Sequence, residues 1–214
     1  MPTNRSISDS VSPELLLASA SPRRQELLRQ IGVRFRIVNH GIDESRLDGE
    51  APRNFVRRMA REKAHSALSA TAADRQPIVL GADTIVVCDD QVLGKPGDRT
   101  DAVRMLTVLS GREHRVFSAV AVAAGERMEQ ILVETVVEFT DINREMIDRY
   151  WDTGEPQDKA GAYGIQGLGG IFVKYIRGSY TGVVGLPLFE TAVLLNSFGI
   201  PCWGPVAVEL DWEQ

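Results

Sequence analysis

Residues 15–28 read Leu-Leu-Leu-Ala-Ser-Ala-Ser-Pro-Arg-Arg-Gln-Glu-Leu-Leu. An apolar run of strand length gives way to small hydroxylated residues, a proline and two arginines, and apolar residues then recur at helical spacing. This order predicts a strand, a tight turn and a helix. Pro22 suits the first position of that helix, where its missing N–H costs nothing, and Ser21 before it suits the N-cap.

The start of this predicted helix is also a candidate anion site. Backbone N–H groups at a helix N-terminus attract negative charge, and Arg23 and Arg24 add two guanidinium groups that suit phosphate geometry. The pattern alone is not specific, because Ser-Pro begins many helices and adjacent arginines are usually solvated. The rest of the chain has to decide between a phosphate site and an ordinary helix start.

Composition narrows the class of protein. The 214 residues are 43% hydrophobic and 25% charged, enough to bury a substantial core in one domain or in two small lobes that share a cleft. A net charge of -5 argues against nucleic acid as a partner, so any anionic ligand should be small. No apolar segment approaches the length of a membrane span, so we expect no membrane association.

Cysteine usage and the polar start of the chain indicate a cytoplasmic location. Cys88 and Cys202 have no metal-ligand spacing, and no secretory signal precedes them, so both thiols should be reduced. Residues 1–13 are polar and Ser-rich, and we expect them to be a disordered extension. We expect residues 14–214 to form a single domain.

A second informative feature is an acidic residue inside an apolar run. Asp83 interrupts a stretch that otherwise predicts a buried strand, and a carboxylate in such surroundings needs a cation, a metal or a proton. Gly81 and Ala82 would leave room beside it for a ligand, and Thr84 adds a hydroxyl. The alternative is that Asp83 caps a turn. A hairpin after this strand should return Lys95 to the same end, beside Asp83.

A further cation is expected on a long helix that follows Pro52. Lys63 falls at the edge of its apolar stripe, where the stem can be covered while the ammonium group enters a cleft. The alternative is an ordinary solvated helix lysine.

A glycine-rich segment later in the chain offers another set of ligand groups. Glycine recurs at every third position over residues 161–167, which lets the backbone approach a ligand closely. Lys159, Tyr163 and Gln166 would supply a charge, a stacking ring and an amide that can read a base edge. Such loops can also be purely structural turns.

Familiar nucleotide and metal motifs are missing. The chain has neither a P-loop nor a complete dinucleotide-binding glycine fingerprint. His40, His65 and His114 show no metal-binding pair at helical spacing, so each is expected to be a surface or core histidine.

Seven motifs occur in an order that is specific when they are taken together. They are SASPRRQELL at 19–28, AREKA at 60–64, GADT at 81–84, GKP at 94–96, LSG at 109–111, DKAGAYGIQG at 158–167 and GLP at 185–187. In this order and over nearly the whole chain, they resemble the Maf family of nucleoside triphosphate pyrophosphatases. The Gly-Ile-Gln-Gly sequence and the arginine after Ser-Pro resemble the branch that acts on dTTP and UTP.

The resemblance implies a fold and a reaction. The fold would be α/β, with a long twisted mixed sheet flanked by helices and a nucleotide-binding cleft between two lobes. The reaction would be hydrolysis of the α–β phosphate bond of a nucleoside triphosphate, with release of the monophosphate and pyrophosphate. A divalent cation, Mg²⁺ or Mn²⁺, would assist, and a homodimer is a family-level expectation.

The resemblance also implies roles for individual residues. Asp83 would be the proton acceptor that activates or orients water, directly or through the metal, and Glu44 would either bind the metal or activate water. We add the hypothesis that Glu44 shares the metal with Asp83. Three positions would set substrate specificity: Arg23, Thr84 and Gln166. Five would hold phosphate oxygens: Ser19, Arg24, Lys63, Lys95 and Lys159. The Gln166 amide has a donor and an acceptor, which match the O4 and N3–H edge of uracil or thymine.

Two other functions remain open at this point. One is a non-catalytic nucleotide-binding regulator of septum formation, in which Asp83 would be dispensable. The other is an enzyme for damaged or modified nucleotides that takes dTTP and UTP only incidentally.

Overall fold

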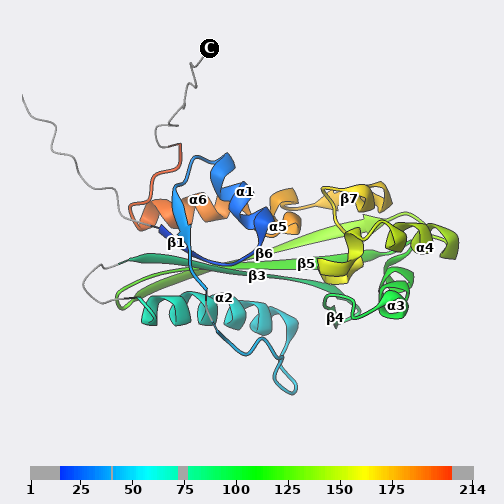
Figure 1. The fold of residues 1–214 in the computed structure, drawn as a ribbon, viewed down its shortest axis with the longest axis horizontal. Coiled ribbons are helices and arrows are strands. Elements are labelled where there is room, and N and C mark those ends of the chain that lie inside the picture. The colour runs from blue at the N-terminus through cyan, green and yellow to red at the C-terminus, as the bar shows by residue number, and fades with distance from the viewer. Residues whose placement is uncertain (1–14, 40, 72–76, 204–214) are drawn as a thin grey trace, which may run out of the picture.

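A seven-stranded mixed sheet runs through the computed structural model, which describes residues 15–39, 41–71 and 77–203 (Figure 1). The strand order is β2-β1-β3-β5-β6-β7, with β4 paired to β3. The strands are β1 Leu15–Ala18, β2 Phe35–Ile37, β3 Ile78–Cys88, β4 Gln91–Leu93, β5 Glu113–Ala124, β6 Arg127–Phe139 and β7 Val173–Arg177. Strand β1 is parallel to β2 and β3, and the other neighbouring strands are antiparallel. The predicted α/β class with a long mixed sheet is confirmed; the predicted extension at 1–13 lies outside the described residues.

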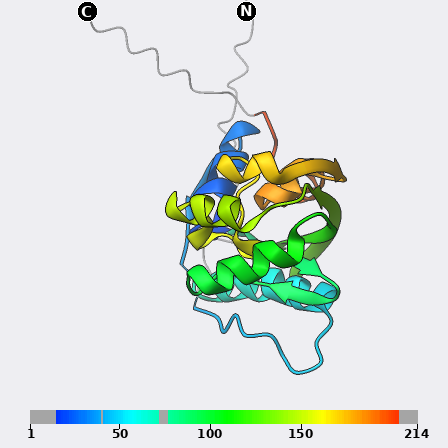
Figure 2. The same ribbon diagram turned by 90° about the vertical axis from the view of Figure 1, so that its right-hand side faces the viewer.

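Helices cover both faces of this sheet. The α-helices are α1 Pro22–Gln30, α2 Pro52–Ser69, α3 Arg99–Leu109, α4 Arg144–Asp152, α5 Tyr180–Val184 and α6 Leu188–Ser197. Short 3-10 helices are η2 Glu155–Asp158, η3 Ala160–Ala162 and η4 Leu168–Phe172. Helix α2 lies on one face, with α1 and α6 on the other (Figure 1), while α3 and α4 stand together at the far end of the long strands (Figure 2). None of the described helices is both long and apolar enough to cross a membrane.

The side chains of β3 alternate between two core layers, as a period of two requires. Leu80 and Ala82 pack in the layer with α1 and α6, whereas Val79 and Ile85 pack in the layer with α2. Asp83 falls in the second register, so it faces the helix that carries Lys63. The alternation of β3 therefore decides which helix supplies a partner for its carboxylate.

Gly81 is explained by the close approach of α2 to β3. A Cβ at this position would meet the carbonyl oxygen of Ala60 and lie 2.5 Å from the amide nitrogen of Ala64. Ala82 is buried in the opposite core layer. The interpretation that Gly81 and Ala82 leave room for a ligand is therefore wrong, because Gly81 leaves room for a helix.

The first motif folds as predicted, with one difference. Helix α1 has Pro22 in its first turn and Ser21 at the N-cap position, but the Ser21 side chain makes no capping hydrogen bond. The hydroxyl that serves this turn belongs to Ser19, whose Oγ accepts the Ser21 N–H at 3.3 Å. This places a second hydroxyl, besides that of Ser21, at the start of α1.

We expect Gly81→Ala to lower the free energy of unfolding by about 3 kcal/mol, because the added methyl group meets helix backbone, which cannot rotate away. Urea denaturation measures the change. Gly97→Ala is the matched control: a Cβ there meets nothing within 4 Å, so its midpoint should stay near wild type. Equal urea-denaturation midpoints for the two variants would show that the packing of α2 against β3 does not require glycine at position 81.

Candidate functional site

A cleft of about 870 Å³ opens between the start of α1, the middle of β3, helix α2 and the segment that contains η2 and η3. Every one of the ten residues singled out in the sequence lines it: Ser19, Arg23, Arg24, Glu44, Lys63, Asp83, Thr84, Lys95, Lys159 and Gln166. Their placement in one cleft is a structural finding. Their individual roles stay predictions.

One lysine and two carboxylates are in contact in the cleft. Lys63 Nζ lies 2.9 Å from Asp83 Oδ1 and 3.1 Å from Glu44 Oε1. The Lys63 side chain is 6% exposed and that of Asp83 12%, so the two charges compensate each other away from bulk water. Asp83 sits inside β3, and neither the turn-cap alternative nor the solvated-lysine alternative holds. Lys95 lines the same cleft, but the cation in contact with Asp83 is Lys63.

This donor set fits a hard divalent cation. Asp83 and Glu44 both contact the Lys63 ammonium group, and carboxylate oxygens are the ligands that Mg²⁺ and Mn²⁺ prefer. Within the described ranges, no group of three or more His, Cys, Asp or Glu residues could hold a metal ion. The described residues thus offer two carboxylates rather than a full set of metal ligands. Sites with one or two carboxylates are usual where the phosphates of a substrate complete the coordination of Mg²⁺.

Arg24 is held in place through all three of its guanidinium nitrogens. Its Nε donates to the Gly185 carbonyl at 2.9 Å, Nη1 to Ser19 Oγ at 3.2 Å and Nη2 to Thr84 Oγ1 at 3.4 Å. Burial lowers the pKa of Arg24 from its ordinary value. Because each terminal nitrogen carries two N–H groups, a second donor on each is left for an anion in the cleft.

Ser118, which the sequence analysis missed, supports Thr84 from the neighbouring strand β5. Its hydroxyl donates to the Gly182 carbonyl at 2.6 Å and lies 3.0 Å from Thr84 Oγ1. The Ser118 proton goes to Gly182, and the Thr84 hydroxyl lies within hydrogen-bond distance of both Ser118 Oγ, at 3.0 Å, and the Gly185 carbonyl oxygen, at 3.3 Å. A lone pair of Thr84 Oγ1 accepts from Arg24. The available signal was a serine, 1% exposed, within an apolar strand.

Asp158 is a second residue that the sequence analysis did not single out by itself. Its carboxylate lies 2.6 Å from Lys159 Nζ and 3.4 Å from Arg23 Nη1. The hydrogen bond from Lys159 holds the pKa of Asp158 below its ordinary value. Two cations of the cleft are therefore paired with the same acid, which is itself 64% exposed.

Glu155 fixes the glycine-rich segment that carries Gln166. Its carboxylate accepts hydrogen bonds from the Tyr150 hydroxyl at 2.7 Å and from the N–H groups of Leu168 at 2.8 Å and Gly169 at 3.0 Å. Burial works to raise the pKa of Glu155, but these hydrogen bonds outweigh it and hold the pKa below its ordinary value. The segment is thus ordered by a carboxylate rather than by long regular structure.

Tyr163 differs from its expected role. It is only 5% exposed, its ring packs edge-on against Phe139, and its hydroxyl is 2.9 Å from Nε2 of His114. The interpretation of Tyr163 as a stacking ring is therefore wrong, because the ring belongs to the core. His114 is a core histidine as expected, and burial lowers its pKa to about 4. His65 is exposed, whereas His40 lies outside the described residues.

We expect Glu155→Gln to lower the free energy of unfolding by about 2 kcal/mol, because an amide group in place of a carboxylate oxygen leaves a backbone N–H unpaired. Chemical denaturation followed by circular dichroism measures this. Glu145→Gln is the control, since its carboxylate is 70% exposed and pairs with the exposed Arg149. A wild-type stability for Glu155→Gln would contradict the ordering role.

Comparisons with known proteins agree with the geometry of the site. A family model described as Maf-like protein matches residues 14–198. The chain is 52% identical over 187 residues to a dTTP/UTP pyrophosphatase of Pseudoalteromonas atlantica, covering 87% of this chain and 97% of that protein. It is 49% identical over 197 residues to a dTTP/UTP pyrophosphatase of Saccharophagus degradans, covering 92% and 94%.

Among solved structures, the Ham1 protein of Staphylococcus aureus aligns over 59% of this chain and 71% of its own, with 10% identity and a TM-score of 0.40. That likeness is too low to carry an argument. The family match and the two close relatives each extend over most of the sequence. The chain belongs to the Maf-like protein family.

Proposed function

We propose that the chain hydrolyses dTTP and UTP between the α- and β-phosphates, releasing the nucleoside monophosphate and pyrophosphate with the assistance of Mg²⁺ or Mn²⁺. One observation carries the proposal. Lys63 Nζ lies 2.9 Å from Asp83 and 3.1 Å from Glu44, in a cleft that Arg24 also lines. Relatives about half identical in sequence bear the name dTTP/UTP pyrophosphatase, which supports the choice of substrates.

The cations of the cleft bind and orient the triphosphate. Arg24 is fixed by Gly185, Ser19 and Thr84, so its remaining N–H groups are aimed before the ligand arrives. Lys63, Lys95 and Lys159, which line the cleft, add ammonium groups that stabilise negative charge as the bond breaks. Donors that need no reorganisation during the reaction are the most effective stabilisers of such charge.

Asp83 accepts the proton of the attacking water. One of its oxygens is committed to Lys63, and the other remains available for the water. A divalent ion held by Asp83, Glu44 and the substrate phosphates would supply Lewis-acid stabilisation and lower the pKa of a bound water. Lys63 compensates part of the negative charge of Asp83 through their ion pair.

Gln166 reads the base. Its exposed amide lines the cleft, and its donor and acceptor match the O4 and N3–H edge of uracil or thymine, whereas cytosine presents a different pattern. Arg23 and Thr84 are the other two residues that we assign to substrate specificity. A cytoplasmic homodimer is part of the same proposal, and sedimentation of the purified protein tests the dimer.

We expect Asp83→Asn to lower turnover of dTTP and UTP at least about 100-fold, since the amide cannot accept the proton. Product analysis with Mg²⁺, with Mn²⁺ and with a chelator measures it, and wild-type turnover should be lost on chelation. Asp152→Asn, an exposed acid of α4 that pairs with Arg99, should leave turnover unchanged. Nucleotide binding without turnover by wild type would instead favour the non-catalytic regulator.

We expect Gln166→Glu to reduce kcat/KM for dTTP and UTP at least about tenfold more than for CTP, because the glutamate has no N–H to donate to O4. Steady-state kinetics with the three nucleotides measure the ratio. Gln157→Glu adds the same charge at an exposed position of η2 that does not line the cleft. Unchanged ratios among the pyrimidine nucleotides would count against base reading by Gln166.

A further inference from the structure

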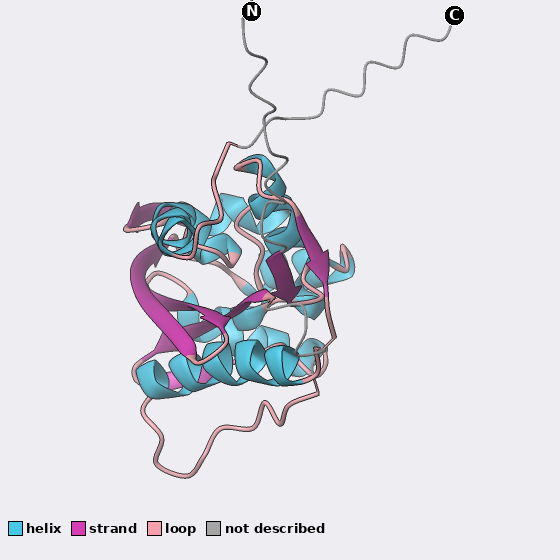
Figure 3. Ribbon diagram, turned by 90° about the vertical axis from the view of Figure 1, so that its left-hand side faces the viewer, coloured by secondary structure: helices cyan, strands magenta, loops and turns pink. Residues whose placement is uncertain are grey.

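Glu44 is carried by a segment that has no helix or strand of its own. Residues 41–51 connect β2 to α2 and contain only a turn at 48–49. Figure 3 shows this stretch as a loop that leaves the body of the protein beside α2. The Glu44 side chain is 58% exposed, and an ion pair at such a position contributes too little to order a loop by itself.

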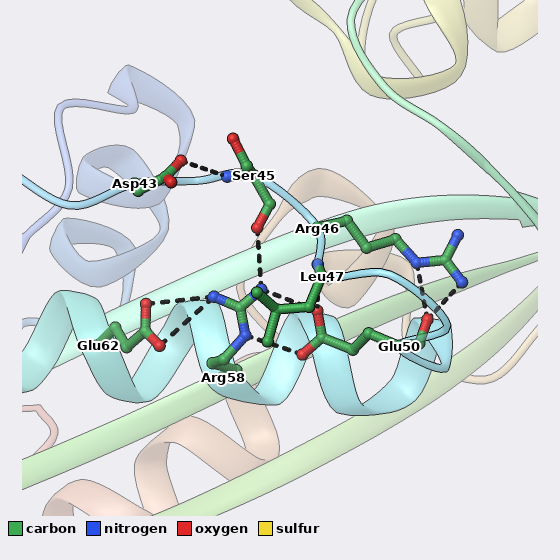
Figure 4. Close-up of polar contacts among 7 residues, drawn as sticks. All are labelled: Asp43, Ser45, Arg46, Leu47, Glu50, Arg58 and Glu62. Atoms are coloured by element: carbon green, nitrogen blue, oxygen red, sulfur yellow. Dashed lines mark hydrogen bonds and ion pairs between the residues drawn. The ribbon is translucent and has the colours of Figure 1, made fainter.

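Arg58 ties the loop to α2 on the far side from the cleft. Arg58 binds the Glu50 carboxylate with two parallel hydrogen bonds, Nε to Oε1 and Nη2 to Oε2, each 2.8 Å long. Its Nη2 also donates to the carbonyl oxygen of Ser45 at 2.9 Å (Figure 4). The side chains of Arg58 and Glu50 are 22% and 10% exposed, so this bidentate pair is shielded from water.

Further hydrogen bonds close the loop around the Arg58–Glu50 pair. The Glu50 carboxylate accepts the Leu47 N–H at 3.2 Å, and the Glu50 carbonyl accepts from Arg46 Nε at 2.7 Å. Beside Glu44, the Asp43 carboxylate accepts the Ser45 N–H at 2.8 Å. The residues on both sides of Glu44 are thus fixed by bonds that do not involve the cleft (Figure 4).

Arg58 and Lys63 lie on the same helix, and each holds the loop at a different point. Arg58 contacts Ser45 and Glu50, while Lys63 contacts Glu44 inside the cleft. Arg58 is not among the residues that line the cleft. A role of Arg58 at the site must therefore pass through the loop.

We propose that Arg58, locked onto Glu50, is a positioning residue that keeps Glu44 beside Lys63 and Asp83. The proposal rests on the proposed function only in that Glu44 serves as a ligand of a divalent cation there. The hydrogen bonds that Arg58 donates to Glu50 also raise the pKa of its guanidinium above the ordinary value.

The direct test compares Arg58→Lys with Glu44→Gln and with the double variant. Lysine keeps the charge but cannot make two parallel hydrogen bonds. We expect Arg58→Lys to weaken Mn²⁺ binding about tenfold in the presence of a non-hydrolysable dTTP analogue, measured by calorimetry. KM for dTTP at saturating Mn²⁺ should change much less. Arg57→Lys, on the exposed side of the same helix, is the matched control.

The double variant tests whether the effects of the two substitutions on Mn²⁺ binding add, which distinguishes a positioning role of Arg58 from a general structural role. If Arg58 acts through Glu44, Arg58→Lys should weaken Mn²⁺ binding little further once Glu44→Gln is present. Additive losses in the double variant would overturn the proposal. So would Mn²⁺ binding by Arg58→Lys at wild-type strength.

Amide hydrogen exchange tests the anchor without any metal or turnover. Arg58→Lys should speed exchange over residues 41–51 at least about tenfold and leave α2 unchanged, whereas Glu44→Gln should not. Unchanged exchange in the loop would overturn the proposal. A wild-type protein without pyrophosphatase activity would contradict the proposed function, and the exchange and Mn²⁺-binding results would still decide the role of Arg58.

Discussion

The ion pair between Lys63 and Asp83 is the interaction on which the arrangement of this protein depends. A carboxylate in the middle of β3 with 12% of its surface exposed would be strongly destabilising without a cation. The cation comes from α2, and it can reach Asp83 only if that helix lies directly against the strand. The absence of a side chain at Gly81 permits this approach. One electrostatic requirement thus links helix packing, strand register and the position of the cleft.

Two segments of the cleft, the loop at 41–51 and the segment with the short 3-10 helices, are each ordered by a glutamate carboxylate. On one side, the Glu50 carboxylate binds Arg58 and holds the segment that carries Glu44. On the other, the Glu155 carboxylate accepts three hydrogen bonds and holds the segment that carries Gln166. In both cases the acid is partly buried and has no proposed role in the reaction. Its hydrogen bonds order a segment that lacks the backbone hydrogen bonds of a long helix or strand.

Local patterns were sufficient for the strand and helix at residues 15–30, for the buried strand that contains Asp83 and for Lys63 at the edge of the apolar stripe of its helix, because each is set by neighbours in sequence. Contacts between distant segments were not predictable in this way. Asp158 meets Arg23 across 135 positions, and the hydroxyl behind Thr84 belongs to another strand. Tyr163 was misinterpreted for the same reason: a ring in a glycine-rich loop suggests a ligand contact until the aromatic core around it is known.

The pairing of Asp158 with Arg23 and Lys159 means that the cleft contains its own counter-charges. A singly charged anion such as chloride gains little there, because each contact that it makes displaces an equivalent internal one. A polyanion that engages several cations at once can displace these internal ion pairs together. The interior of the cleft therefore favours ligands that present several charges.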